Sequence, residues 1–184
     1  MGSIWKPRRI WAALCITTGV ALFIALIRPG GLLLCVTPVK GGPPLAEIRI
    51  APGERFTIRY NHSVEDAPIW ETHSVDAKGR IYIEEERYLK FGAGMGKMPG
   101  VGRMVRRGPY EVIEAMHMPT GDFVLRIGSP GVDHTLIVHG RELNLSAIAP
   151  HTAVQFSARP ISWLRLMGHR LRQRSAPWNA AAKQ

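Results

Sequence analysis

Two hydrophobic patterns divide the chain: a continuous apolar run near the N-terminus, then an alternating pattern through most of the remainder. Residues 10–27 form 18 uncharged positions, followed by Arg28-Pro29-Gly30. A helix of 18 residues is about 27 Å long, close to the roughly 30 Å hydrocarbon core of a bilayer. The pattern therefore predicts one transmembrane helix at residues 10–28, preceded by a basic cytoplasmic segment at residues 1–9.

The flanks of this segment favour an uncleaved anchor, with a cleaved signal peptide as the alternative. Residues 28–31 lack the small-residue pattern of a signal-peptide cleavage site. Cys15 and Cys35 both follow leucine, which argues against a lipoprotein signal. The basic side chains of residues 1–9 outnumber those just after the helix, so the positive-inside rule places the N-terminus in the cytoplasm. We therefore expect a single-pass protein of the bacterial inner membrane with its bulk in the periplasm.

From residue 31 onwards, apolar residues alternate with polar ones, as is typical of half-buried β-strands. The predicted strands are 32–36, 48–50, 56–60, 69–75, 81–88, 110–117, 123–127, 134–139 and 154–158. Turn-forming residues separate them, and no convincing helical pattern lies between them. We predict an all-β domain at residues 31–158, an antiparallel sandwich or barrel-like fold behind the N-terminal helix.

Charge distinguishes the two ends of the chain from its middle. The net charge is +10, and residues 1–28 and 159–184 contribute four and six basic residues without any acid. Residues 29–158 hold 14 basic and 14 acidic residues. A nucleic-acid-binding domain needs its positive field on the folded body, so we expect no nucleic-acid partner. Anionic lipid headgroups are the simpler partner, through the helix and the basic tail.

The basic tail, residues 159–184, also contains a helical pattern. Trp163, Leu164, Met167 and Leu171 share one face of a helix. An interfacial helix that lies on the membrane is one interpretation. A frayed, solvated C-terminus is the other.

Two motifs stand out within the predicted β domain. His62-Ser63-Val64-Glu65 ends one strand, and Glu71 lies near the start of the next. Phe91-Gly92-Ala93-Gly94 opens a glycine-rich loop that we predict at residues 91–108. This order of motifs over residues 31–145 resembles the bacterial family called domain of unknown function 1850. A second His-Ser-Val at residues 73–75 departs from the family pattern.

The resemblance implies a role in solute transport. Proteins of that family are small, carry an N-terminal membrane segment, and are encoded beside TRAP-type transporters of the TAXI class, which take up organic acids. We therefore expect a membrane-anchored accessory subunit without enzymatic activity or cofactor, whose partners are the integral membrane subunits of the transporter. The residues expected to dock against the partner are His62, Ser63, Glu65, Glu71, Phe91, Gly92 and Gly94.

The residues of the first motif also raise metal and nucleophile interpretations. His62, Glu65 and His73 match no established ligand spacing, and a strand places residues i and i+3 on opposite faces. Adjacent residues of a strand point to opposite faces, so His62 cannot activate Ser63 as a nucleophile. Activation of Ser63 by His73 or His134 from across the sheet stays open as an alternative. We favour a strand-end polar cluster in which Glu71 faces His62 across the hairpin.

The glycine-rich loop resembles a phosphate-binding loop only superficially, because it lacks the Gly-Lys-Ser/Thr ending and no helix follows it. Anion contact through nearby basic residues stays open, and these are Lys97, Arg103, Arg106 and Arg107. The functional alternatives to the transporter subunit are an independent periplasmic enzyme or metal-binding protein, and a transient assembly factor for the transporter.

Overall fold

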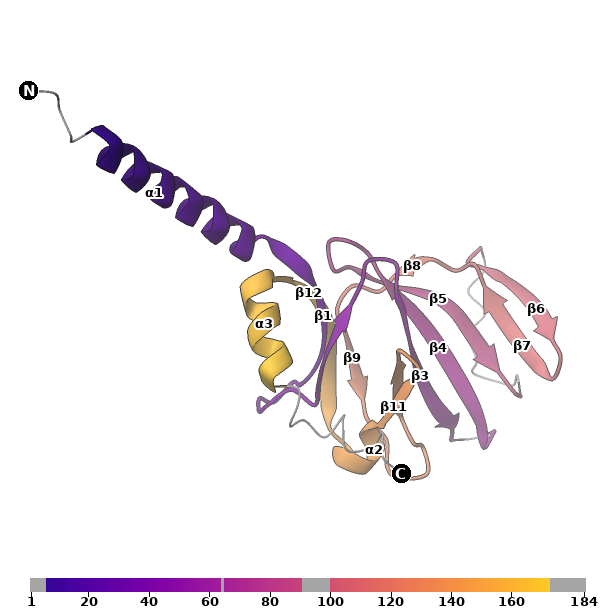
Figure 1. The fold of residues 1–184 in the computed structure, drawn as a ribbon. Helices are drawn as coiled ribbons and strands as arrows, with labels where there is room; N and C mark the ends of the chain where they lie inside the picture. Colours follow the sequence, from indigo (N-terminus) through magenta and orange to yellow (C-terminus); the bar gives the residue numbers. More distant parts are fainter. Residues whose placement is uncertain (1–5, 64, 91–99, 173–184) are drawn as a thin grey trace, which may run out of the picture.

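The chain folds into two antiparallel β-sheets from which a helix projects (Figure 1). The computed structural model describes residues 6–63, 65–90 and 100–172, with side chains for all of these except residues 6–10 and 169–172. All pairings between the described strands are antiparallel. The prediction of an all-β antiparallel domain is therefore confirmed, with a sandwich-like arrangement of the sheets.

The smaller sheet has four strands and contains the strand that directly follows the N-terminal helix. In spatial order these strands are β2 (Ala46–Ile50), β1 (Pro29–Pro38), β12 (Ala153–Ser162) and β9 (Phe123–Arg126). The pairing of β1 with β12 extends from Pro29 opposite Ser162 to Pro38 opposite Val154. This long pairing ties the two ends of the domain together.

The larger sheet has eight strands and carries both sequence motifs. Its spatial order is β11 (Arg141–Asn144), β10 (Thr135–Val138), β3 (Arg55–His62), β4 (Ala67–Val75), β5 (Ile81–Tyr88), β7 (Tyr110–Glu114) and β6 (Arg103–Arg107), while the short β8 (Met118–Pro119) pairs with β5. A single helical turn, α2 (Leu145–Ile148), follows β11. Asn144 caps this turn by accepting the backbone N–H of Ala147 at 2.9 Å.

The main core fills the space between the two sheets. Leu34, Phe56, Ile58, Leu136 and Phe156 are all buried within it. Burial of each such side chain contributes about 1.5–3 kcal/mol. A second, smaller core lies on the larger sheet and consists of Ile69, Tyr88 and Ile113, with Tyr60, Met104 and Met116 packed against it.

Three of the strands, β6, β8 and β11, and the short helix α2 were not predicted. Residues 103–107 belong to the predicted glycine-rich loop but form β6, whose alternation is obscured because only Met104 and Val105 are apolar. The short strand β11 carries little alternation for the same reason. The predicted strand 110–117 ends at Glu114, because Ala115 and His117 adopt positive φ angles of 57° and 39°.

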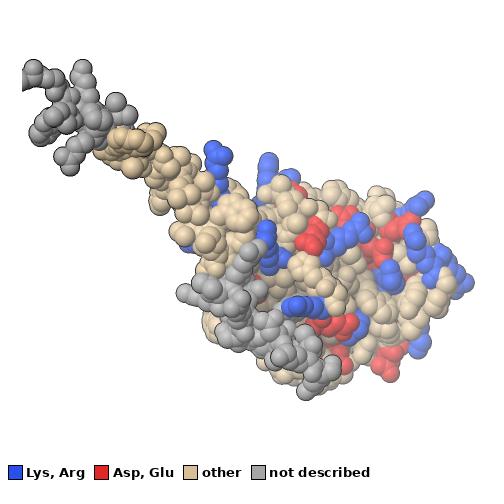
Figure 2. All heavy atoms as spheres, viewed as in Figure 1, with Lys and Arg blue, Asp and Glu red and all other residues tan. Residues whose placement is uncertain are grey.

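The N-terminal helix α1 (Lys6–Ile27) exposes apolar side chains along its length. Figure 2 shows its described part as largely uncharged, whereas blue and red side chains gather on the β domain. Within the part of the chain that the structure describes, no helix is long and apolar enough to cross a membrane. The transmembrane helix predicted at residues 10–28 is thus not supported.

The C-terminal helix α3 (Trp163–Arg172) follows β12 directly. Leu166 is buried against Leu33 and Ile161 on the outer face of the smaller sheet. Residues 163–172 thus form a helix, in line with the predicted helical pattern. However, Trp163, Leu164 and Met167 of the predicted face are exposed, and Leu166 packs against the domain.

Candidate functional site

The first motif forms the turn between β3 and β4. His62 ends β3 directly opposite Ala67, the first residue of β4. The Nδ1 atom of His62 accepts the backbone N–H of Glu65 at 3.3 Å, and the His62 carbonyl accepts the N–H of Asp66 at 3.0 Å. Asp66 adopts a positive φ of 46°, which closes the turn. His62 therefore satisfies backbone groups at the strand end, as expected for a polar cluster of this kind.

The Glu65 and Ser63 positions of the turn differ in their surroundings. The backbone carbonyl of Glu65 accepts a hydrogen bond from Nζ of Lys90 at 3.3 Å. This contact connects the turn to the segment that follows β5. Ser63 is exposed to solvent at the tip of the turn.

Glu71 does not lie opposite His62, so the expected cross-strand pair is corrected. Glu71 is paired with Ile58, because the turn between His62 and Ala67 sets the register of the whole hairpin. The carboxylate instead accepts a hydrogen bond from the hydroxyl of Tyr60, with 2.8 Å between Tyr60 Oη and Glu71 Oε1. Glu71 therefore belongs to the inner face of the larger sheet.

Two glutamates and two tyrosines meet on this inner face, and we call them the carboxyl–phenol cluster. Glu71 of β4 lies directly opposite Glu86 of β5. Tyr60 donates to Glu71, and the hydroxyl of Tyr88 donates to Oε2 of Glu86. Tyr88 itself is buried beside Ile69 in the second core. Two acidic and two hydroxyl groups thus share a partly buried site between neighbouring strands.

Burial changes the acidity of the groups in the carboxyl–phenol cluster. Desolvation raises the pKa of Glu71 and the charge of Glu86 adds to this effect, while the hydrogen bond from Tyr60 opposes it. Desolvation and the nearby glutamates also raise the pKa of Tyr60 and of Tyr88. Both phenols therefore stay protonated and donate their hydrogen bonds. The raised pKa of Glu71 favours the protonated form of this carboxyl.

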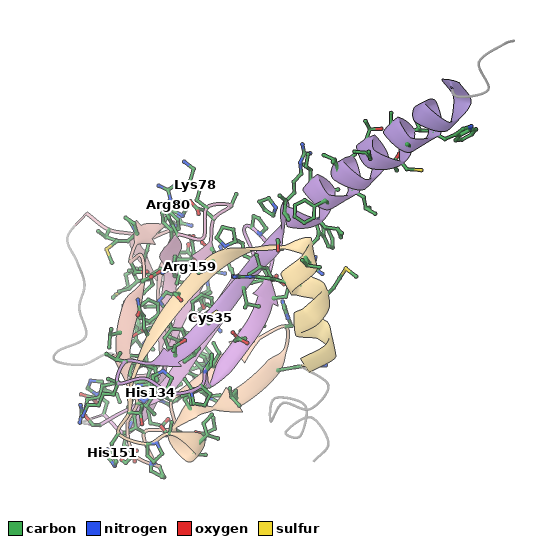
Figure 3. All side chains as sticks on the ribbon, turned by 90° about the vertical axis from the view of Figure 1, so that its left-hand side faces the viewer. Cys35, Lys78, Arg80, His134, His151 and Arg159 are labelled. Carbon is green, nitrogen blue, oxygen red and sulfur yellow. The ribbon has the colours of Figure 1, made fainter. Side chains whose placement is uncertain are left out.

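The carboxyl–phenol cluster adjoins the ring of His134. The rings of Tyr60 and His134 stack with 5.0 Å between their centroids. Nδ1 of His134 accepts the backbone N–H of Gly128 at 3.0 Å, and burial lowers the pKa of His134. Figure 3 shows His134 toward the end of the domain away from α1. The cluster thus has a neutral aromatic neighbour rather than a positive charge on this side.

A family model covers this part of the chain. Residues 56–145 match the family described as domain of unknown function, DUF1850. The match supports the resemblance seen in the sequence, over a shorter range than residues 31–145. It includes the turn at His62 and all four residues of the carboxyl–phenol cluster. No curated protein and no solved structure was found to match the chain.

Within the DUF1850 segment, the residues considered for a metal site are not brought together. His73 is paired with Phe56, near the opposite end of β3 from His62. Its ring is buried and stacks between Phe56 and Phe123, at centroid distances of 5.0 and 5.1 Å. In the described residues, no group of three or more His, Cys, Asp or Glu side chains is placed to hold a metal ion. The same separation of His73 from the turn opposes its use as a base for Ser63.

The second predicted motif of the DUF1850 segment lies outside the described residues, with Phe91, Gly92, Gly94 and Lys97 among them. The basic residues that follow are on β6, and each forms an ion pair with a glutamate of β7. Arg103 and Arg107 contact Glu114, and Arg106 contacts Glu111 at 3.1 Å. These pairs partly neutralise the basic residues that were considered for anion contact.

Sequence reasoning missed a second polar cluster, which involves the second His-Ser-Val. Oγ of Ser74 donates to Oε1 of Glu84 at 2.6 Å, and Nδ1 of His117 lies 2.9 Å from the same oxygen. Partial burial acts to raise the pKa of Glu84, but the hydrogen bonds from Ser74 and His117 outweigh it and lower that pKa. The serine here bonds to the carboxylate rather than to the histidine, which is not the order of a nucleophilic triad.

Proposed function

We propose that the chain is a membrane-associated accessory subunit of a TRAP-type transporter of the TAXI class, which takes up organic acids. It docks against the integral membrane subunits of the transporter and catalyses no reaction of its own. The observation that carries this proposal is the family-model match over residues 56–145, which spans the predicted docking residues His62, Ser63, Glu65 and Glu71.

We further propose that α1 inserts into the cytoplasmic membrane and that the β domain lies on the periplasmic side. In support, α1 exposes large apolar side chains, with 66% of Trp11 and 61% of Phe23 accessible. Apolar side chains without a protein partner are stable in lipid, where no water has to be ordered around them. The basic residues before the helix favour the cytoplasmic side for the N-terminus.

The turn between β3 and β4 is our proposed contact with the transporter. Ser63 and Asp66 are exposed there, and Tyr60 and Glu71 of the carboxyl–phenol cluster lie on the same two strands. A membrane attachment confines the domain near an integral partner and so raises its effective concentration. A small contact, such as one turn, is then sufficient for association.

Affinity purification of the full chain in mild detergent tests this proposal. We expect the integral transporter subunits to be recovered in stoichiometric amounts, and the double charge reversal Glu65→Lys, Asp66→Lys to reduce their recovery at least fivefold. The matched control is Glu142→Lys, which reverses a charge on β11 away from the turn. Equal thermal unfolding midpoints of the variants would show that the domain is folded.

Three outcomes contradict the proposal. Recovery of the chain without any transporter subunit contradicts the docking role. Recovery only in substoichiometric amounts favours a transient assembly factor instead. Retention of transporter subunits by the charge-reversed variant contradicts the assignment of the turn as the contact.

A further inference from the structure

The helix α3 contacts the domain on one side and leaves an apolar side uncovered. Leu166 is 2% exposed and packs against Leu33 and Ile161 of the smaller sheet. Trp163, Leu164 and Met167 are 44%, 53% and 55% exposed. These three residues occupy positions i, i+1 and i+4 and therefore lie within one apolar stripe of the helix. Large apolar side chains gathered on one exposed helix face usually mark an interaction surface.

This apolar face lies next to the point at which α1 meets the domain. The backbone N–H of Trp163 donates to the carbonyl of Arg28 at 3.2 Å, and α3 contacts α1 as well as β1. Figures 1 and 3 both show α3 below the end of α1, along the outer face of the smaller sheet. Gly30 permits this close approach, because a Cβ atom there would lie 2.9 Å from atoms of Trp163. The exposed apolar surfaces of the two helices are therefore neighbours.

The charges around the apolar face are basic. The guanidinium of Arg49 lies 6.0 Å from the ring centroid of Trp163, and Arg165 is exposed on α3 itself. The sequence from residue 159 to residue 184 contains no acidic residue. A tryptophan beside arginines is the combination that the headgroup region of a membrane favours, with the ring in the interface and the charges toward anionic headgroups.

We propose that α3 lies in the headgroup region of an anionic bilayer, with Trp163, Leu164 and Met167 in contact with lipid beside the inserted α1. The proposal rests on the membrane insertion of α1 that is part of the proposed function. An interfacial amphipathic helix buries its apolar side about 5–10 Å into this region. Because Leu166 fixes α3 to the smaller sheet, this contact also orients the domain. The turn between β3 and β4 lies at the far end of the domain from α1 and α3 (Figure 1), so the docking contact proposed there is with a part of the transporter subunits that projects from the membrane.

Site-directed labelling of the full chain in lipid nanodiscs tests this placement. The probe is a nitroxide attached at Leu164→Cys, with Cys15 and Cys35 replaced by alanine. The matched control is the same label at Val124→Cys, because Val124 is 61% exposed on the edge strand β9. In phosphatidylglycerol discs we expect the label at position 164 to be relaxed mainly by dissolved oxygen, and the label at position 124 mainly by a water-soluble nickel chelate.

A second pair of variants tests the role of charge in the same discs. Arg165→Glu should at least halve the oxygen contribution at position 164, because it places an acid against anionic headgroups. Arg126→Glu on β9 is the matched control and should leave the oxygen contribution at position 164 unchanged. Replacing phosphatidylglycerol by phosphatidylcholine should weaken the contact in the unmodified chain and remove the difference between these two variants.

The outcomes separate this inference from the proposed function. If the chain enters the disc but the label at position 164 is as accessible to the nickel chelate as the label at position 124, the inference about α3 is wrong. The proposed function is not affected by that result. If the label at position 164 is protected from the nickel chelate in detergent without lipid, and this protection depends on chain concentration, the apolar face binds a second copy of the chain. That result also contradicts the inference. A chain that does not enter the discs contradicts the insertion of α1 itself. Co-purification with transporter subunits is measured independently of all three.

Discussion

Glu71 of β4 and Glu86 of β5 lie directly opposite each other, and each accepts a hydrogen bond from a tyrosine. In the described residues neither carboxylate forms an ion pair. Two like charges at opposite positions destabilise a sheet, and partial burial strengthens the repulsion. The raised pKa of Glu71 follows from this arrangement, with desolvation as its largest cause.

The carboxyl pair predicts a gain in stability when one charge is removed. Because the folded-state pKa of Glu71 is raised, the folded state binds its proton more tightly than the unfolded state does. Stability is therefore lost as the pH rises from the ordinary value of 4.5 through the folded-state pKa. Glu71→Gln keeps an acceptor for Tyr60 and removes the charge. We expect it to raise the free energy of unfolding at pH 8 by about 1 kcal/mol, measured by urea denaturation.

A double-mutant cycle isolates the repulsion between the two carboxylates. Glu71→Gln and Glu86→Gln should each stabilise the domain at pH 8, and the double variant should gain less than the sum of the two. The coupling energy should be about 1 kcal/mol at pH 8 and smaller at pH 4. Strict additivity at pH 8 would mean that the two side chains do not interact.

Much of the fold could be predicted from the sequence, because alternation records which residues of a strand face the core. The predicted strand 81–88 coincides with β5, and the predicted strand 69–75 lies within β4. The position of Glu71 on the inner face also follows from alternation with Ile69. Its partner could not be predicted, because the pairing of Glu71 with Glu86 depends on a register that shifts between Thr72 and His73.

The candidate site shows the limits of local patterns more clearly. The glutamates at positions 84, 85 and 86 form one acidic run in the sequence, yet they make three different contacts. Glu84 bonds to Ser74, Glu85 to Arg87 and Glu86 to Tyr88. The register shift between Thr72 and His73 lies between the contact of Glu84 with Ser74 and the contact of Glu86 with Tyr88. Such a bulge leaves only a weak mark on the hydrophobic pattern.

Gly79 in the turn between β4 and β5 gives a prediction about the packing of the two sheets. A Cβ atom there would lie 2.4 Å from the carbonyl oxygen of Ala158 on β12, and the φ of Gly79 is +82°. Gly53 has nearly the same φ, +81°, with nothing within 4 Å. Both alanine variants incur the backbone strain of about 1 kcal/mol. Gly79→Ala must also displace β12, so we expect a total loss of about 3 kcal/mol by urea denaturation. Equal losses for the two variants would show that the sheets are not in close contact at this point.

Leu166 gives a prediction about the attachment of α3. Leu166→Ala removes the buried contact with Leu33 and Ile161, which should cost about 2 kcal/mol or more of local stability. Amide hydrogen exchange in α3 should then accelerate at least tenfold, while exchange in β3 and β4 stays unchanged. Leu164→Ala is the matched control, because Leu164 is 53% exposed, and it should leave exchange in detergent unchanged. Equal acceleration in both variants would contradict the assigned buried side of the helix.

His73 gives a prediction about the pH dependence of stability. Burial lowers its pKa from 6.5 to about 4, and within the described part of the chain its Nδ1 atom has no hydrogen-bond partner. The unfolded state therefore binds a proton more readily between pH 6.5 and pH 4, so stability is lost as the pH falls through this range. The full loss from this group is about 3 kcal/mol. His73→Phe keeps the stack with Phe56 and Phe123, and should flatten the dependence of the unfolding free energy on pH between 6.5 and 4.

The matched control for His73 is an exposed histidine, changed to another polar residue. His151 lies in a turn on the surface with a positive φ of 60°, which asparagine accommodates well. His151→Asn should therefore keep the pH dependence of the unmodified chain. The pKa of His134 is also lowered, so His134 also reduces stability as the pH falls. The unfolding free energy of the His73→Phe variant therefore keeps part of its dependence on pH. If His73→Phe retains the whole slope, the proton that destabilises the domain in acid binds elsewhere, and His73 is accessible to solvent in the folded state.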